Sequence, residues 1–152
     1  MLGEEVTSIG IGAFEGCTSL TSLVLPSNLK SIGDSAFAGC AALSRVWGRG
    51  CEDLPWAELG SIGANAFRGT AITDVAVPSG VTRLPRGVFA DCSALDRVVL
   101  PEGVVEIGAG CFENCAALRT ISVPPAATIR RGAFSKCSAL KGVEALMERY
   151  VD

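Results

Sequence analysis

Residues 95–115 read LDRVVLPEGVVEIGAGCFENC, and this stretch contains every part of a unit that recurs along the chain. Its first part, 95–100, is rich in branched residues and is followed by Pro101, which cannot donate a backbone hydrogen bond to a neighbouring strand. We therefore expect a short strand here and a second extended piece at 104–107. The part around Phe112 is too short for an independent helix, so we expect one helical or 3-10 turn with the ring of Phe112 pointing inward.

Phenylalanine marks the copies of this unit. The six phenylalanines are separated by 23, 30, 22, 23 and 22 residues and lie at Phe14, Phe37, Phe67, Phe89, Phe112 and Phe134. Isoleucine or leucine lies five residues before each of them, at Ile9, Ile32, Ile62, Leu84, Ile107 and Ile129. Cysteine or threonine lies three residues after each of them, at Cys17, Cys40, Thr70, Cys92, Cys115 and Cys137. A period of this length, with branched residues at strand spacing, indicates a solenoid rather than a globule.

The sequence therefore predicts one domain over residues 1–152, folded as a right-handed solenoid of about six coils. The coils are expected to stack through parallel strands spaced about 4.8 Å apart, so the fold is mainly β with short helical or 3-10 turns. Each coil buries its leucine, isoleucine and phenylalanine side chains against its neighbours.

The pattern Leu-x-x-Val-x-Leu-Pro-x-x-Val-x-x-Ile-Gly-x-x-Ala-Phe-x-x-Cys resembles the BspA-type leucine-rich repeat, and the resemblance extends from Val6 to about Leu146. It implies a single leucine-rich repeat domain that serves as a binding or adhesive solenoid, without an active site common to the family.

Two places depart from the pattern. Sixteen positions separate Val46 from Ile62, where nine separate Val98 from Ile107, so the second coil carries an insertion within about residues 47–59. The sequence Asp-Leu-Pro-Trp at 53–56 is expected to begin a short helix there. The third coil is one residue shorter than the others near its threonine.

The sequence predicts that the two ends of the solenoid are covered to different extents. The chain enters in the middle of a coil at Val6, and this end is expected to be poorly covered, as in a fragment or one end of a larger array. At the other end, Leu146 and Tyr150 are four residues apart, so we expect a helix over about residues 144–151 that covers the last coil.

Charge and composition exclude several classes of protein. The 13 basic and 16 acidic residues leave a net charge of -3, without the basic excess that nucleic-acid binding requires. We expect no direct membrane span, because no apolar run approaches the roughly 20 residues of a membrane helix. Acids near the start, where a secretory signal carries bases, and cysteines expected to stay reduced favour an intracellular location over the cell surface.

The cysteines are interpreted as packing residues. Equivalent cysteines on adjacent coils would lie near or above the strand spacing of about 4.8 Å, wider than the roughly 3.8 Å between the Cβ atoms of a disulfide. Without histidine or CxxC spacing, a zinc site is not expected either. We expect small buried thiols that donate weak hydrogen bonds to nearby carbonyls. Cys51, within the insertion, is the exception and a candidate for a reactive or cross-linking thiol.

The sequence predicts no catalytic residue, no metal ligand and no cofactor. Histidine, the usual base that activates serine or cysteine, is absent. The acids of the insertion, Glu52, Asp53 and Glu58, are interpreted first as solvated side chains, and an enzyme that uses them or Cys51 is the least favoured hypothesis. The Gly-x-Gly pieces at 10–12 and 108–110 are not followed by the helix of a nucleotide-binding fingerprint.

The outward positions of the strands remain as the candidate site. Stacking aligns these positions into two columns, one of Ser22, Arg45, Asp74, Arg97, Thr120 and Gly142, the other of Val24, Trp47, Ala76, Val99, Ser122 and Glu144. An apolar row beside arginines is typical of the centre of a protein interface. The predicted partner-binding residues are Val24, Arg45, Trp47, Trp56, Arg97 and Val99. Strand propensity alone also explains the valines and the tryptophan, and the two tryptophans alternatively pack under the loop.

Two functions follow from these observations. The first is a non-enzymatic module that binds another protein, as a scaffolding or accessory subunit of a larger assembly. The alternative is a fragment of a cell-surface adhesion or ligand-binding leucine-rich repeat protein.

Overall fold

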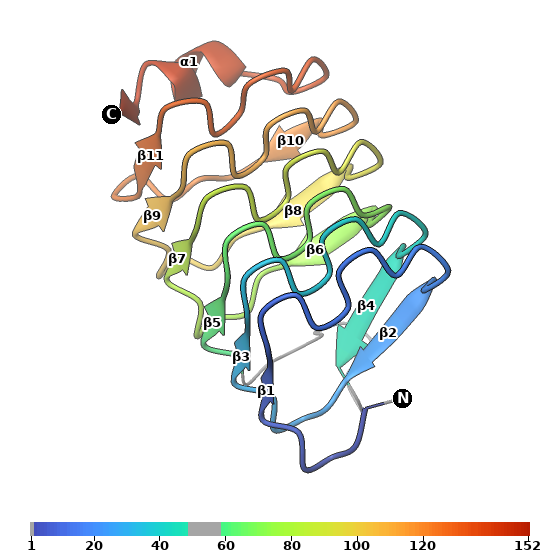
Figure 1. The fold of residues 1–152 in the computed structure, drawn as a ribbon. Coiled ribbons are helices and arrows are strands. Elements are labelled where there is room, and N and C mark those ends of the chain that lie inside the picture. The colour runs from blue at the N-terminus through green and yellow to red at the C-terminus, as the bar shows by residue number, and fades with distance from the viewer. Residues whose placement is uncertain (1, 49–58) are drawn as a thin grey trace.

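A computed structural model describes residues 2–48 and 59–152, and it confirms the stacked-strand solenoid of about six coils (Figure 1). Short strands form two rows along the solenoid. The first row consists of β1 (Ser8–Ile9), β3 (Ser31–Ile32), β5 (Ser61–Ile62), β7 (Arg83–Leu84), β9 (Glu106–Ile107), β11 (Thr128–Arg130) and β12 (Tyr150–Val151). The second row consists of β2 (Ser22–Leu25), β4 (Arg45–Gly48), β6 (Asp74–Ala76), β8 (Arg97–Val99) and β10 (Thr120–Ile121).

Every strand pairs in parallel with its equivalent in an adjacent coil, and the ladders are interrupted once in each row. The first row forms the sheets β1-β3-β5 and β7-β9-β11-β12, and the second forms β2-β4 and β6-β8-β10. Both interruptions adjoin the coils whose sequences depart from the repeat. Trp47 and Gly48, at the start of the range that contains the insertion, lie in β4. The predicted short helix at 53–56 lies outside the described residues.

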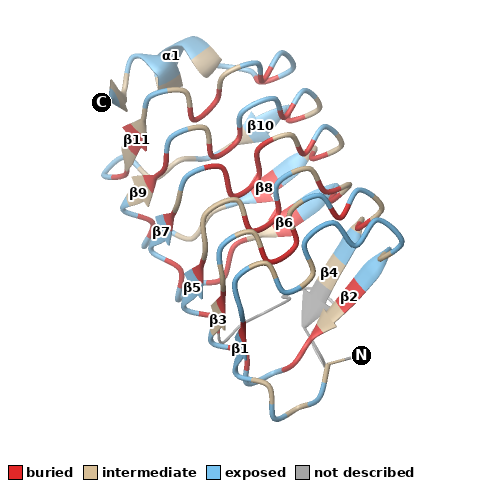
Figure 2. Cartoon of the chain, viewed as in Figure 1, coloured by how far each residue is buried: buried red, intermediate tan, exposed pale blue. Residues whose placement is uncertain are grey.

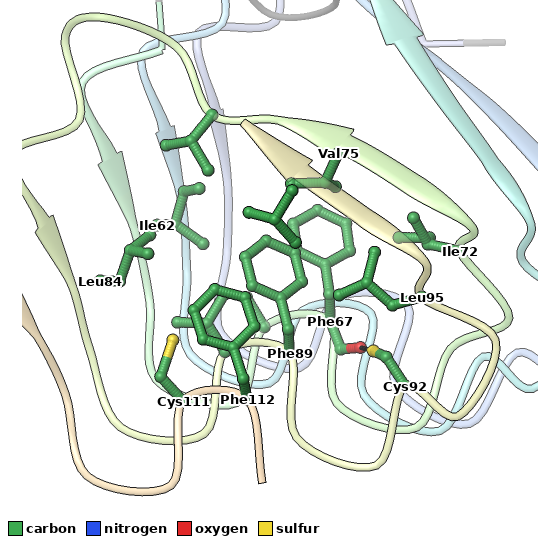
Figure 3. Close-up of a cluster of buried hydrophobic side chains, with 14 of the residues drawn as sticks. Ile62, Phe67, Ile72, Val75, Leu84, Phe89, Cys92, Leu95, Cys111 and Phe112 are labelled. Atoms are coloured by element: carbon green, nitrogen blue, oxygen red, sulfur yellow. Dashed lines mark hydrogen bonds between the residues drawn. The ribbon is translucent and has the colours of Figure 1, made fainter. Parts of the chain in front are cut away.

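The core is a set of columns, each made of the same residue position in successive coils. Figure 2 shows buried positions recurring from coil to coil along both rows. The phenylalanine rings form one such column, with ring centroids 5.2 to 5.9 Å apart and interplanar angles of 3° to 13°. Figure 3 shows Phe67, Phe89 and Phe112 in succession, with Ile62 and Leu84 on one side and Leu95 on the other. Every phenylalanine after Phe14 is almost completely buried.

The turn around each phenylalanine alternates two kinds of hydrogen bond. In the second coil, the amides of Ala36, Ala38 and Cys40 each donate to the carbonyl three residues earlier, as in the predicted 3-10 turn. The amides between them donate instead to the next coil, and that of Phe37 reaches the Ala66 carbonyl at 2.8 Å.

Left-handed residues two positions before and after the phenylalanine keep the turn from winding into a helix. In the second coil these are Ser35 at φ 55° and Gly39 at φ 73°. The same two positions are left-handed in every coil. An L-residue in this conformation meets a steric penalty that glycine avoids, and asparagine and aspartate tolerate it better than most residues.

The C-terminal end differs from the helix predicted over 144–151. Helix α1 spans only Val143–Met147, and Tyr150 belongs to β12, which pairs with β11. The Tyr150 hydroxyl accepts the amide hydrogen of Phe134 at 2.9 Å. In the earlier coils the equivalent phenylalanine amide donates to a carbonyl of the next coil. Arg149 donates to the carbonyls of Pro124 at 2.8 Å and Ala127 at 3.2 Å. A strand and two side chains therefore close this end together with the helix.

The Phe89→Ala substitution removes a ring from the middle of the column. We expect it to lower the free energy of unfolding by about 3–5 kcal/mol, because it removes a buried ring and leaves a cavity between two others. Phe14→Ala serves as the matched control and should cost less, because Phe14 is only partly buried. Urea denaturation of both variants measures the difference, and equal losses would contradict the central role of the column.

The Tyr150→Phe substitution keeps the ring and removes only the hydroxyl that accepts the Phe134 amide hydrogen. We expect a loss of about 1–3 kcal/mol, because a partly buried donor is left without its acceptor. Amide hydrogen exchange should show faster exchange at Phe134, with little change at Phe89. Unchanged protection at Phe134 would mean that the hydroxyl does not close this end.

Candidate interaction surface

The outer face of the second row places the predicted columns in register. Strands β6, β8 and β10 pair so that Arg97 lies between Asp74 on one side and Thr120 on the other. Strands β2 and β4 pair Ser22 with Arg45. Within each strand the central residue is buried or partly buried and its neighbours face outward, which is the alternation expected for a sheet with one solvated face.

The predicted apolar row is most exposed at Val99. Val99 pairs with Ala76 and is 57% exposed, whereas Ala76 and Val24 are half-buried. Trp47 lies opposite Val24 in the backbone register, and Trp56 lies outside the described residues. The row is not continuous, because β4 and β6 belong to different sheets.

The last members of the two columns are not on a strand. Gly142 precedes α1 in a left-handed conformation and Glu144 lies in its first turn, so the sheet face ends after β10. The sequence pattern could not show this, because the spacing of apolar residues in the last coil resembles that of the others.

A shallow hollow lies over β8 and β10. It is lined by Arg97, Val98, Val99, Thr120, Ile121 and Ser122. The site therefore offers one cation, one exposed apolar side chain and two hydroxyls within two adjacent coils. Thr120 and Ser122 were not among the predicted partner-binding residues, although their positions in the columns pointed to them.

Two ion pairs join coils on this face, and they differ in geometry. Arg119 donates two hydrogen bonds to Asp96, at 2.6 and 2.7 Å. These bonds hold the pKa of Asp96 below its usual value and raise the pKa of Arg119. In the second pair, Nε of Arg97 lies 3.9 Å from Oδ1 of Asp74, and the two side chains are 70% and 64% exposed, respectively. In each pair the partners are 23 residues apart, about one repeat, which is the sequence signal that would have found them.

Ion pairs in the first row bridge several coils. Glu106 accepts from Arg130 at 2.9 Å and lies 3.5 Å from Arg83, so one carboxylate bridges three coils. Arg130 also donates to the carbonyl of Asp152 at 3.0 Å.

The cysteine column confirms the predicted hydrogen bonds to carbonyls. Each thiol donates at 3.1 Å to the carbonyl of the phenylalanine in the preceding coil, in the pairs Cys40 to Phe14, Cys92 to Phe67, Cys115 to Phe89 and Cys137 to Phe112. In the third coil Thr70 replaces cysteine, and its hydroxyl lies 3.4 Å from the Cys92 sulfur.

Burial makes these thiols poor nucleophiles. Desolvation raises the pKa of Cys92, Cys111 and Cys115, and it raises the pKa of Cys137 to about 11. Within residues 2–48 and 59–152, no three side chains of histidine, cysteine, aspartate or glutamate converge as metal ligands would. Cys51 and the acids of the insertion lie outside these ranges.

The helix in the described part of the chain is too short to cross a membrane.

Comparison with known proteins identified related repeats over most of the chain. The family model for the BspA-type leucine-rich repeat region matches in six copies over residues 1–48 and 54–145. A leucine-rich repeat protein from Bacteroides ovatus is 34% identical, with a TM-score of 0.68 over 89% of this chain and 40% of its own. A leucine-rich repeat protein from T. pallidum is 29% identical, with a TM-score of 0.69 over 97% of this chain and 78% of its own.

A leucine-rich cell surface protein from Faecalibacterium prausnitzii is 25% identical, with a TM-score of 0.59 over 100% of this chain and 56% of its own. The chain thus spans about half the length, or less, of the Bacteroides and Faecalibacterium structures. No curated protein matched the sequence.

Thiol labelling tests the environment of each described cysteine. At about pH 8 we expect iodoacetamide to modify the exposed Cys17 in the folded protein and to spare Cys92, Cys111, Cys115 and Cys137. A thiol with a pKa near 11 is only about 0.1% ionised at that pH. Peptide mass spectrometry assigns each site, with concentrated guanidinium chloride as the control in which all react. Rapid labelling of Cys115 in the folded protein would contradict the buried column.

Proposed function

The chain belongs to the BspA-type leucine-rich repeat family, and on that premise we propose that it is a non-enzymatic module that binds another protein through the outer face of β6, β8 and β10. The observation that carries the proposal is the exposure of Val99 beside Arg97. An exposed apolar side chain surrounded by polar groups matches the centre and rim of a protein interface.

The size of a stable interface requires that several coils take part. A standard interface buries about 800 Å² per partner, roughly a tenth of the 7566 Å² of accessible surface on this chain. Val99 and Arg97 alone do not supply this area. The two outward columns together supply this area, because the same outward positions recur in successive coils. Binding to this face therefore involves a partner that extends across the strands, and Trp47 and Val24 on β4 and β2 are the predicted continuation.

A catalytic role has little support from the described side chains. The thiols of the column donate to backbone carbonyls, and burial raises the pKa of those whose shift is resolved. The ionised groups on the sheet face are engaged in pairs or exposed to solvent rather than enclosed in a cleft. These properties suit a surface for binding.

A role at the cell surface is the second candidate, and the similarity to the F. prausnitzii cell surface protein favours it. In that setting the same sheet face would bind an extracellular protein. Protease treatment of intact source cells, followed by detection of the chain with an antibody, distinguishes this setting from an intracellular assembly.

The Val99→Glu substitution tests the proposed function. We expect it to reduce the recovery of the partner from source-cell extract by about tenfold or more, because a charge would be buried at the centre of the interface. Quantitative mass spectrometry of proteins that co-purify with the tagged chain measures the recovery. Trp47→Glu tests the predicted continuation on β4.

Val105→Glu provides the matched control for Val99→Glu. Val105 is 46% exposed and lies next to β9 in the first row, so the same charge is introduced on a different face. Thermal unfolding must show that both variants remain folded. The proposal fails if Val99→Glu retains every partner, or if Val105→Glu loses the same partners to the same extent.

A further inference from the structure

Basic side chains outnumber acidic ones along the second row of strands. Among the described side chains in these strands, immediately before them or at the equivalent places in the last coil, the bases are Arg45, Arg97, Arg119 and Lys141, and the acids are Asp74, Asp96 and Glu144. The whole chain has the opposite balance, with a net charge of -3. This face therefore carries a small excess of basic charge on an acidic protein.

Asp74 and Asp96 are already engaged, whereas Arg45 and Lys141 are not and Arg97 is held only loosely. Glu144 lies beyond the sheet, in the first turn of α1. Asp96 is held by both hydrogen bonds from Arg119. Asp74 accepts a hydrogen bond from the Thr73 hydroxyl at 3.1 Å and pairs with Arg97 only at 3.9 Å. The Arg97 guanidinium makes no hydrogen bond within the described part of the chain.

Arg45 and Lys141 form neither an ion pair nor a side-chain hydrogen bond with any described residue, and both are exposed. Their charges, together with that of the loosely held Arg97, remain available to a ligand. Because complementary charge steers encounter and sets specificity, such a face selects an anionic partner.

We propose that this face binds an acidic, extended segment of the partner protein, whose carboxylates pair with Arg97 and Arg45 while an apolar side chain contacts Val99. The inference rests on the proposed function and specifies the chemistry of its partner. A polypeptide fits better than a nucleic acid, because a few separate cations beside an apolar side chain do not follow a phosphate backbone. The hydroxyls of Thr120 and Ser122 can donate to the carbonyls of such a segment.

The spacing of the cations matches that of side chains on an extended chain. Arg45 and Arg97 occupy the same column, two coils apart, with Asp74 in the coil between them. Although β4 and β6 belong to different sheets, the phenylalanine rings of these three coils are 5.3 and 5.9 Å apart in succession, so the coils that carry the two arginines are roughly 11 Å apart along the solenoid. Side chains on one face of an extended strand are an even number of residues apart, and four residues span ~13 Å. Acidic residues at positions i and i+4 therefore reach both arginines, and Asp74 disfavours an acid at position i+2, between them.

Selection from a random library of peptides of about twelve residues, displayed on phage, tests this proposal. Wild-type protein, Arg97→Glu and Arg86→Glu are immobilised in parallel. Arg86 is a matched control, because it is exposed, follows β7 in the first row and undergoes the same change of charge. We expect wild type and Arg86→Glu to enrich peptides with two acids four residues apart. Arg97→Glu should not enrich them.

Fluorescence polarisation with the most enriched peptide then gives the size of the effect. We expect Arg97→Glu to weaken its Kd by about tenfold or more, and Arg86→Glu by less than about twofold. Thermal unfolding verifies that both variants are folded. Equal weakening by the two variants would show that net charge alone is responsible and would overturn the proposal, as would a selection without acidic enrichment.

One outcome separates this inference from the proposed function. If Val99→Glu abolishes capture of the natural partner while no acidic peptide binds, the face binds protein and its preference for acids is wrong. If Val99→Glu does not reduce capture of the natural partner, the proposed function itself is wrong.

Discussion

The stacking distance between coils is the constraint on which the rest of the structure depends. Successive phenylalanine rings are 5.2 to 5.9 Å apart, close to the spacing of about 4.8 Å between paired strands. At that distance every buried side chain meets its own equivalent above and below. A coil whose side chain differs in size at one position therefore leaves a gap or a clash in both neighbours. The same distance lets each buried thiol reach the phenylalanine carbonyl of the preceding coil.

Stacking also determines the electrostatics of the surface, because a charge one coil away is a closer neighbour than most residues nearby in the sequence. Asp96 and Arg119 are 23 residues apart and form two hydrogen bonds, and Glu106 bridges Arg83 and Arg130 in the same way. In the first row, Arg83, Glu106 and Arg130 form such a bridge. In the second row, Asp74 and Asp96 are engaged, while Arg45 and Lys141 stay exposed.

Sequence periodicity predicted the fold because the interior constraint repeats without exception in the phenylalanine column, and alternation along the strands predicted that Arg97 and Val99 face outward. The left-handed residues beside each phenylalanine were not predicted, since serine, asparagine, aspartate and lysine occupy several of these positions. The helix predicted at the C-terminal end was too long for a different reason. Leu146 and Tyr150 have helical spacing, but Tyr150 gains a strand partner and the Phe134 amide by leaving the helix. The ion pair between Asp96 and Arg119 was missed because it becomes visible only when residues are compared one repeat apart.

The division between interior and outward columns explains how such a fold accommodates new partners. An interior residue is constrained by two equivalent neighbours, so phenylalanine recurs in all six coils. The outward column of the second row instead contains Val24, Ala76, Val99 and Ser122, which differ in size and polarity while their backbones keep the same register where the strands pair. Because these side chains face solvent, changing one costs the solenoid little packing energy. On the proposed function, specificity for a partner would reside in positions that the fold leaves free, and Arg97 and Val99 supply both charge and exposed apolar surface there.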